Sequence, residues 1–250
     1  MGLKPHVHGD FALPVDFPTI PQLNSAVNNY LRIGRKMTTS VRARGRPKHI
    51  DDGRILDAVL EVFWDKGYAG ASLTDLADAA GVSRPRLYDA FPDKESMYLA
   101  VANRVIDDTK AALDSALLAK RSLEDELSGF FAMSIDHYLS SPKSRGCLVT
   151  TTAPAEAIGS LAVRQALNRL IAVLDEAFER RFQIAQDRGE IGSGISAARL
   201  GRQATAVVQG LALRARSGAD RAEMQDIADT TIRQLAAGPR HRPDAVRHHR

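Results

Sequence analysis

Three side chains within one short segment have the types and the spacing that suit contact with the edges of DNA bases. Pro85, Arg86 and Asp89 fall at the start of a predicted helix. At 100° per residue the apolar Leu87 and Phe91 share one face, which turns these three residues outward. Arginine donates to guanine O6 and N7, a carboxylate accepts from cytosine N4, and a proline ring can touch a thymine methyl. The segment therefore predicts base contacts in the major groove.

Two of these residues also have simpler interpretations. Asp89 carries a charge that repels the phosphates of DNA. Pro85 suits the first turn of a helix, because the N–H that it lacks would have no helical partner there. Both interpretations stay open on the sequence alone.

A first helix is predicted by apolar residues at helical spacing. From Asp51 onward, Ile55, Val59 and Phe63 recur at intervals of four residues, and Gly67 supplies a stop. This helix precedes the segment described above. It supplies the apolar face against which the shorter helices can pack.

A tight turn is predicted between the next two helices. Ser72 stands three residues before Asp75, the spacing of a capping box at a helix start. Gly81 suits the left-handed conformation that ends this second helix, and Ser83 caps a third helix that reaches about Phe91. Two short helices joined in this way form a helix-turn-helix.

Composition narrows the classes of protein to be considered. The chain has 250 residues, 44% of them hydrophobic and 26% charged, which suits a globular protein. Its single cysteine, Cys147, excludes an intrachain disulfide and a four-cysteine zinc site. The motifs G-x-S-x-G, Walker A, G-x-G-x-x-G and H-E-x-x-H are absent, so neither a catalytic site, a metal nor a cofactor is predicted. Without a long apolar run or a signal core, the expected location is the cytoplasm, with no membrane segment.

Positive charge is concentrated before the first helix. The net charge is only +4, but residues 32–54 hold eight Lys and Arg residues against two Asp residues. Within this stretch Arg44, Arg46 and Lys48 form an arm that could enter the adjacent minor groove or follow the DNA backbone. The alternative is a solvated run of charge with no partner.

The stretch ILDAVLEVFWDKGYAGASLTDLADAAGVSRPRLYDAFPDKESMYLAV resembles the DNA-binding domain of the tetracycline-repressor (TetR/AcrR) family of bacterial transcription regulators. The features that carry the resemblance are the G-Y before the second helix, the A-A-G-V-S turn, L-Y-x-x-F in the third helix and D-K-E at the fourth. The later segments RGCLVTT and ARLGRQATAVVQGLALRARSG are similar to the family's ligand-binding and dimerisation domain, but more loosely. The resemblance implies an all-α regulator, which in this family is mostly a repressor.

The resemblance also implies contacts to DNA phosphates, which set register and affinity rather than sequence preference. The residues at the matching positions are Ser72, Thr74, Arg84, Tyr88 and Lys94. Ser72 could instead act only as a helix cap, and Tyr88 only as a packed ring. Family members often carry histidine where this chain has Ala90, so one customary phosphate contact is missing.

The predicted architecture is all-α, with an N-terminal helix-turn-helix domain followed by a helical ligand-binding and dimerisation domain. After the DNA-binding segment, helix follows helix, with breaks near residues 120–122, 141–146, 154, 189–195 and 217–220. The predicted divisions are a disordered extension with the basic arm (1–48), the DNA-binding domain (49–95), the second domain (96–237) and a disordered basic tail (238–250). Met37 is an alternative start, which would make residues 1–36 dispensable.

A pocket for a small-molecule effector is predicted in the second domain, where apolar walls carry few polar groups. The candidate residues are Leu127, Phe130, Phe131, Ser134, His137, Tyr138 and Cys147. The same pattern describes an ordinary core. Cys147 follows Arg145, whose charge would lower a thiol pKa and suit a sensor of electrophiles or oxidants. A buried, inert thiol is the alternative.

A homodimer is predicted because one domain reads too few bases, and a two-fold dimer matches a palindromic operator in double-stranded DNA. The candidate interface combines a stripe of small residues with an apolar face on the last helix, namely Gly201, Thr205, Val208, Ala212, Ile227 and Thr231. Contact within one chain is an equal alternative for any of them.

The function predicted from the sequence is a transcriptional repressor released from its operator by an effector. Two alternatives remain open: an all-α enzyme that uses His137 or Cys147, and a constitutive DNA-binding protein without an effector. The helix-turn-helix favours the first interpretation over the enzyme.

Overall fold

The computed structural model describes residues 52–141 and 143–237, and all regular structure in these ranges is helical. The predicted arm (Arg44, Arg46 and Lys48) and the predicted tail lie outside the described residues. The helices are α2 (Asp52–Gly70), α3 (Leu73–Ala80), α4 (Arg84–Ala90), α5 (Lys94–Ala116), α6 (Leu123–Tyr138), α7 (Leu148–Glu156), α8 (Leu161–Asp187), α9 (Ala197–Arg216) and α10 (Arg221–Ala237). The predicted all-α class is confirmed.

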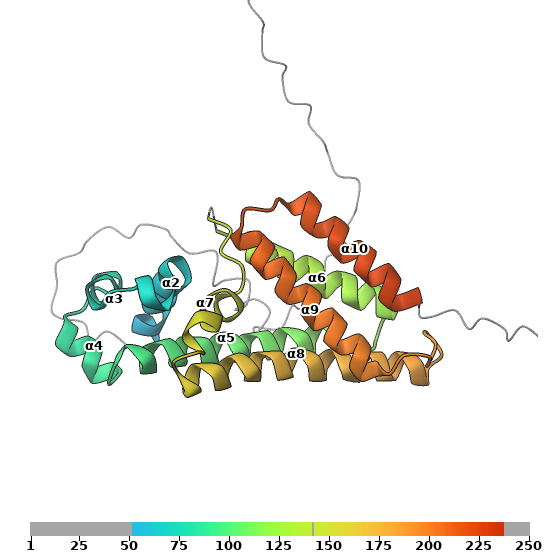
Figure 1. Cartoon of the computed structure of the whole chain (residues 1–250), viewed down its shortest axis with the longest axis horizontal. Coiled ribbons are helices and arrows are strands. Elements are labelled where there is room, and N and C mark those ends of the chain that lie inside the picture. The colour runs from blue at the N-terminus through green and yellow to red at the C-terminus, as the bar shows by residue number, and fades with distance from the viewer. Residues whose placement is uncertain (1–51, 142, 238–250) are drawn as a thin grey trace, which may run out of the picture.

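The helices form two groups joined by long elements (Figure 1). Helices α2, α3 and α4 cluster at one end of the molecule, while α6, α9 and α10 pack together at the other. The long helices α5 and α8 run side by side along the lower edge of the view in Figure 1, where α5 extends from α4 to beneath α6, and α7 contacts both α2 and α8. The first group is therefore held on the second by α5 and α7. Within the described residues no helix is long and apolar enough to cross a membrane.

Helix α2 forms as its apolar spacing predicts. Ile55, Val59 and Phe63 are fully buried. The regular helix is interrupted at Gly67, whose φ of +71° lies in the left-handed region, although helical turns continue to Gly70. Glycine tolerates this backbone angle without strain, which explains the predicted stop.

The turn between α3 and α4 also follows local chemistry. Ser72 and Asp75 form the predicted capping box, and Gly81 adopts a left-handed φ of +67° after the last residue of α3. Ser83 caps α4 by accepting from the N–H of Arg86. Leu87 is fully buried in the core, and α4 packs on α3.

The core of the second group is aromatic. The rings of Phe130 and Phe178 meet edge to face, with centroids 5.4 Å apart, and Phe131 packs beside both. Edge-to-face pairs contribute about 0.5–1.5 kcal/mol beyond their burial. This cluster joins α6 to α8.

A buried ion pair fixes the start of α6 on the end of α8. Arg181 Nε donates to Glu126 Oε2 at 2.7 Å, and both side chains are almost completely buried. Glu126 also accepts from the backbone N–H groups of Ala119 and Lys120, so the connection between α5 and α6 is held too. Loss of one partner from such a pair is costly, because the other charge stays buried.

The stripe of small residues on α9 serves the contact with α8 of the same chain. A methyl group on Gly201 would lie 2.9 Å from the backbone nitrogen of Glu179, so the two helices approach closely here. The residues that share this buried face are Gly201, Thr205, Val208 and Ala212. The prediction of a dimer interface at these four positions is therefore wrong, and the alternative of an intrachain contact holds. Ile227 and Thr231 on α10 stay partly exposed.

The break predicted near residue 154 falls just after Glu156. Helix α7 includes Pro154 and continues to Glu156. Proline removes one helical N–H donor. The helix ends only two residues later, so the effect of the proline is a short helix rather than a break at the proline itself.

Replacement of Gly201 tests the close approach of α8 and α9. We expect Gly201→Ala to destabilise the protein by about 1–3 kcal/mol, because the added methyl group meets backbone atoms that cannot yield easily. Gly129→Ala on the exposed side of α6 is the control. It meets only the end of the Arg121 side chain and should stabilise its helix by about 0.5–1 kcal/mol. Urea unfolding at one protein concentration measures the free energy of unfolding of both variants. Equal changes in the two variants would contradict the close packing of α8 on α9 at Gly201.

Candidate nucleic-acid interface

The exposed face of α4 is the candidate surface for reading DNA. Pro85 and Asp89 are exposed on the side opposite the buried Leu87, as the helical spacing predicts. Tyr88 is 41% exposed and flanks them, so its ring is not packed in the core. A short helix thus presents polar side chains on a rigid apolar anchor.

Arg86 lies at one edge of this face rather than at its centre. Its guanidinium Nη2 donates to Asp52 Oδ1 at 2.6 Å, and 28% of its side chain is exposed. Asp52 is the first residue of α2 and precedes Arg86 by 34 positions. Sequence reasoning missed Asp52 because no local spacing connects the two residues.

The side chains predicted to contact phosphates have different hydrogen-bond partners in the structure. Arg84 donates to the Thr74 hydroxyl, which joins the first turns of α4 and α3. The Ser72 hydroxyl accepts from the N–H of Asp75 at 3.1 Å and donates to its carboxylate at 2.8 Å. The capping alternative for Ser72 is therefore present in the structure, and its hydroxyl hydrogen is already engaged.

Lys94 is held beside an aromatic ring of α2. It is the first residue of α5, and its ammonium group lies 4.5 Å from the centre of the Tyr68 ring. Asp93 caps the helix by accepting from the N–H of Ser96 at 2.7 Å. A cation–π contact limits the positions of the ammonium group while leaving its charge unneutralised.

The carboxyl group of Asp75 is strongly acidic. Its hydrogen bond with Lys66, at 2.6 Å, and its bonds from Ser72 lower the pKa from 3.8 to about 2. The ionised carboxylate is therefore the form that stabilises α3. Its contribution is complete above the unfolded value of 3.8 and is lost as the pH falls through about 2.

We expect Asp75→Asn to lower the free energy of unfolding at neutral pH. The gap from the native protein should narrow between about pH 4 and pH 2, because the native carboxyl group becomes neutral in that range. Urea unfolding across this pH series measures the gap. Asp78→Asn, exposed on the same helix and outside the capping box, is the control. If the difference in free energy of unfolding between the native protein and Asp75→Asn stays constant down to about pH 2, the ionised Asp75 carboxylate is not the stabilising form.

The connection between α6 and α7 clamps α2 to the second group. The indole N–H of Trp64 donates to the Gly146 carbonyl at 2.9 Å in a buried hydrogen bond. The Arg145 guanidinium stacks 4.6 Å from the Trp64 ring centre and pairs with Glu61 and Asp65 at 2.7 and 3.1 Å. We call residues 143–147 the clamp segment.

Glycine is required within the clamp segment. Gly146 has a φ of +67°, and a methyl group added there would lie 2.1 Å from the Ala212 carbonyl oxygen of α9. The segment is therefore wedged between α2 and α9. Arg216 at the end of α9 also donates to the Trp64 carbonyl at 2.9 Å.

A small internal cavity lies next to the clamp segment. Three predicted pocket residues, Phe130, Tyr138 and Cys147, line it. The other lining residues are Thr109, Thr150, Leu170, Leu174 and Val208. The cavity volume is about 10 Å³, close to the minimum that holds one water molecule.

The remaining predicted pocket residues are buried but do not line this cavity. Leu127 and Phe131 belong to the core, and the Ser134 hydroxyl donates to the Phe130 carbonyl at 2.9 Å. The His137 ring packs 5.1 Å from the Trp64 ring. Apolar spacing predicted burial correctly here, but it did not separate core from cavity.

The Cys147 thiol is buried, and burial raises its pKa. Arg145 does not lower it, because the guanidinium points to Trp64 and its two carboxylate partners. A raised pKa reduces the thiolate fraction that a reactive cysteine needs. The structure thus favours the inert alternative.

Ellman's reagent tests this directly, because Cys147 is the single thiol of the chain. We expect the folded protein to react at least about tenfold more slowly than the chain unfolded in urea, since burial limits both access and ionisation. The rate is followed at one pH in both states. Equal rates would contradict the inert assignment.

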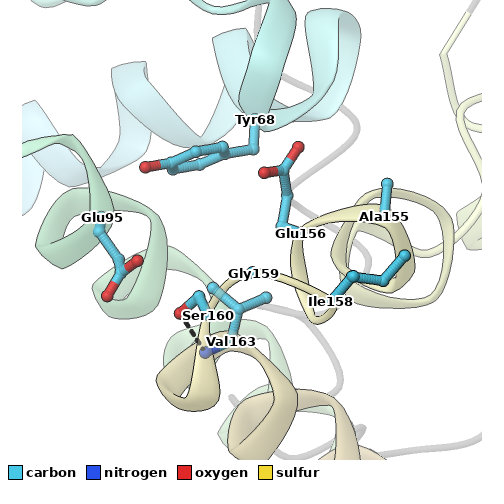
Figure 2. A pocket seen from close by; sticks show the side chains of 8 residues that line it. All are labelled: Tyr68, Glu95, Ala155, Glu156, Ile158, Gly159, Ser160 and Val163. Carbon is cyan, nitrogen blue, oxygen red and sulfur yellow. Dashed lines mark hydrogen bonds between the residues drawn. The ribbon is translucent and has the colours of Figure 1, made fainter.

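A second, larger cleft lies between the end of α2, the start of α5 and the segment that joins α7 to α8 (Figure 2). It measures about 360 Å³ and brings together Tyr68 of α2, Glu95 of α5 and Glu156 of α7. Burial raises the pKa of Tyr68, and the carboxylates of Glu95 and Glu156 raise it further. Sequence reasoning missed the cleft because its walls come from three distant segments. Among the described residues, no group of three or more His, Cys, Asp or Glu is placed to hold a metal.

Helix α2 carries two short helices joined by a capped turn, and an all-α second group follows them. This arrangement defines a helix-turn-helix DNA-binding protein with a helical regulatory domain. The family model for bacterial regulatory proteins, tetR family, matches residues 55–101. The model for the tetracyclin repressor-like C-terminal domain matches residues 124–231. The HTH-type transcriptional repressor ComR of Escherichia coli strain K12 is 31% identical over 193 residues, which cover 77% of this chain and 92% of ComR. The chain belongs to the tetR family of bacterial transcription regulators.

Two further relatives agree with this assignment. The uncharacterized HTH-type transcriptional regulator YezE of Bacillus subtilis strain 168 is 26% identical over 76% of this chain and 99% of its own length. A solved structure of a cysteine mutant of the TetR family regulator CifR, complexed with 26bp double-strand operator DNA, is 25% identical. It aligns with a TM-score of 0.68 over 76% of this chain and 98% of the CifR chain.

Proposed function

We propose that the protein is a transcriptional repressor that binds a palindromic operator in double-stranded DNA and leaves it when a small-molecule effector binds. The observation that carries this proposal is the exposed face of α4, anchored through the buried Leu87. In this proposal residues 49–95 bind DNA in the cytoplasm, and residues 96–237 bind the effector and a second copy of the chain. The repressor name of ComR and the operator DNA bound to CifR support it.

Base contacts are assigned to Pro85, Arg86 and Asp89. Pro85 and Asp89 stand at the centre of the exposed face, where they meet the base edges first. Arg86 approaches from the edge next to α2. Phosphate contacts are assigned to Ser72, Thr74, Arg84, Tyr88 and Lys94, and the arm of Arg44, Arg46 and Lys48 is assigned to the backbone or the minor groove.

The proposed dimer uses the outer sides of α9 and α10. Ile227 and Thr231 are partly exposed on α10. On α9, Leu213 is 54% exposed and Ala206 is exposed too, on the side turned away from the buried stripe. Apolar residues left open on two neighbouring helices suit packing against the same helices of a second copy.

The effector is assigned to the internal cavity of the second domain. Its walls are apolar apart from the hydroxyls of Thr109, Tyr138 and Thr150 and the thiol of Cys147, which suits a small, mainly apolar ligand. At about 10 Å³ the cavity must enlarge before it holds such a ligand. The effector would therefore favour a conformation different from this one, which is the requirement for shifting a two-state equilibrium.

The small cavity is also the observation that favours a second candidate, a constitutive DNA-binding protein without an effector. An enzyme based on His137 or Cys147 is less well supported. Burial raises the pKa of the Cys147 thiol, which opposes nucleophilic catalysis. The His137 ring is packed against Trp64.

Selection of genomic fragments by the purified protein tests the function, and two variants test the roles. We expect an enriched palindrome, with a preference of about a thousandfold or more over a scrambled duplex. Arg86→Ala should reduce discrimination at one operator position by about 1–3 kcal/mol. Lys94→Ala should weaken binding to all sequences alike and lower the salt slope by about one.

The two variants are measured on the same set of single-base operator variants at two salt concentrations. If both variants lose the same affinity for every operator variant, the assignment of Arg86 to a base and of Lys94 to a phosphate is wrong. If the native protein enriches no sequence and its binding to DNA is lost as salt is raised, the proposed function itself is wrong.

A further inference from the structure

The ion pair between Asp52 and Arg86 lies on the surface that faces DNA in the proposed function. Asp52 begins α2, and 65% of its side chain is exposed. Arg86 belongs to the first turn of α4, where its backbone N–H donates to the Ser83 hydroxyl. The carboxylate therefore joins the starts of two helices, with its negative charge at the edge of the candidate base-reading face.

A carboxylate at this position opposes binding to DNA in general. Each acidic group close to the phosphates weakens the sequence-independent attraction that basic groups provide. As an exposed ion pair, the contact contributes at most about 1 kcal/mol to folding stability. Neither general affinity nor stability thus gives a sufficient physical reason for Asp52 at this position.

Geometry supplies a different role for the carboxylate. A guanidinium group has five N–H donors in a fixed plane, so Asp52 can hold one end of Arg86 while other N–H groups face a base. Holding a long side chain in one direction reduces the rotamer freedom lost on binding. Partial neutralisation also makes Arg86 a weaker partner for any phosphate that it meets.

The neighbouring arginine of α4 is held in a different way. Arg84 donates to the neutral hydroxyl of Thr74, so its full positive charge stays available for a phosphate. Two arginines in the same helical turn thus have an acidic and a neutral partner. This difference matches one base-reading and one phosphate-binding role.

We propose that Asp52 is a positioning residue that directs Arg86 toward a base edge and away from the phosphates. It raises sequence discrimination and lowers sequence-independent affinity. The inference rests on the proposed function and assigns a specificity role to a residue outside the helix-turn-helix. Asp52 itself need not contact DNA.

The test compares Asp52→Ala, Asp52→Asn, Arg86→Ala and the Asp52→Ala/Arg86→Ala double variant. Binding is measured to the selected operator, to its single-base variants and to a scrambled duplex. We expect Asp52→Ala to bind the scrambled duplex several-fold more tightly, and to lose about tenfold discrimination at the same position that Arg86→Ala affects. The double variant should lose no more discrimination than Arg86→Ala alone, because the two residues act as one unit. Asp52→Asn keeps a hydrogen-bond acceptor for Arg86, so this variant should retain part of the discrimination at that position.

Asp57→Ala is the matched control. Asp57 is also an exposed acid of α2 paired with an arginine, but its partner is Arg104 of α5 rather than a residue of α4. It should leave base discrimination unchanged, and urea unfolding verifies that every variant is folded. If Asp52→Ala keeps the native preference at every position while Arg86→Ala does not, the inference is wrong and the proposed function stands. If the native protein selects no sequence, the proposed function fails first.

Discussion

The clamp between Trp64 and the segment that ends at Cys147 determines how the two groups of helices are related. Trp64 donates its indole N–H to Gly146, and its carbonyl accepts from Arg216 of α9. Arg145 covers the ring and binds two carboxylates of α2. Because α3 packs on α2 and α4 packs on α3, the direction of the exposed face of α4 depends on these contacts. The long helix α5 adds a second connection but does not replace them.

The arginines of this chain show why net charge is a poor guide to its function. Arg145 and Arg181 are buried and neutralised by carboxylates, so they hold helices together rather than attract DNA. Arg84 and Arg86, by contrast, stand on the surface, where neighbouring helices fix their side chains. The excess of basic over acidic residues is small. The position and partner of each arginine therefore carry the functional information.

Features of the fold that depend on neighbouring residues could be predicted from the sequence. Contacts between distant residues could not. The caps at Ser72 and Ser83 and the left-handed Gly81 depend on residues within four positions, and each forms as predicted. The small residues around Gly201 correctly indicated close helix packing, but spacing along one helix does not identify the partner helix. The pair of Asp52 and Arg86 spans 34 positions and leaves no periodic signal. Core and cavity positions in α6 are equally apolar, so their roles could not be separated.

The internal cavity lies next to the contacts that hold Trp64 of α2. Cys147 lines the cavity and directly follows Gly146, whose carbonyl holds Trp64. Gly146 packs closely against α9, because a methyl group added to it would lie 2.1 Å from the Ala212 carbonyl oxygen. A ligand that enlarges the cavity would move at least one of the elements that line it, which are the clamp segment and helices α5, α6, α7, α8 and α9. Two of these elements contact Trp64 directly, the clamp segment through Gly146 and α9 through Arg216. In the proposed function, a displacement of either element is the shortest physical connection between the effector and α2.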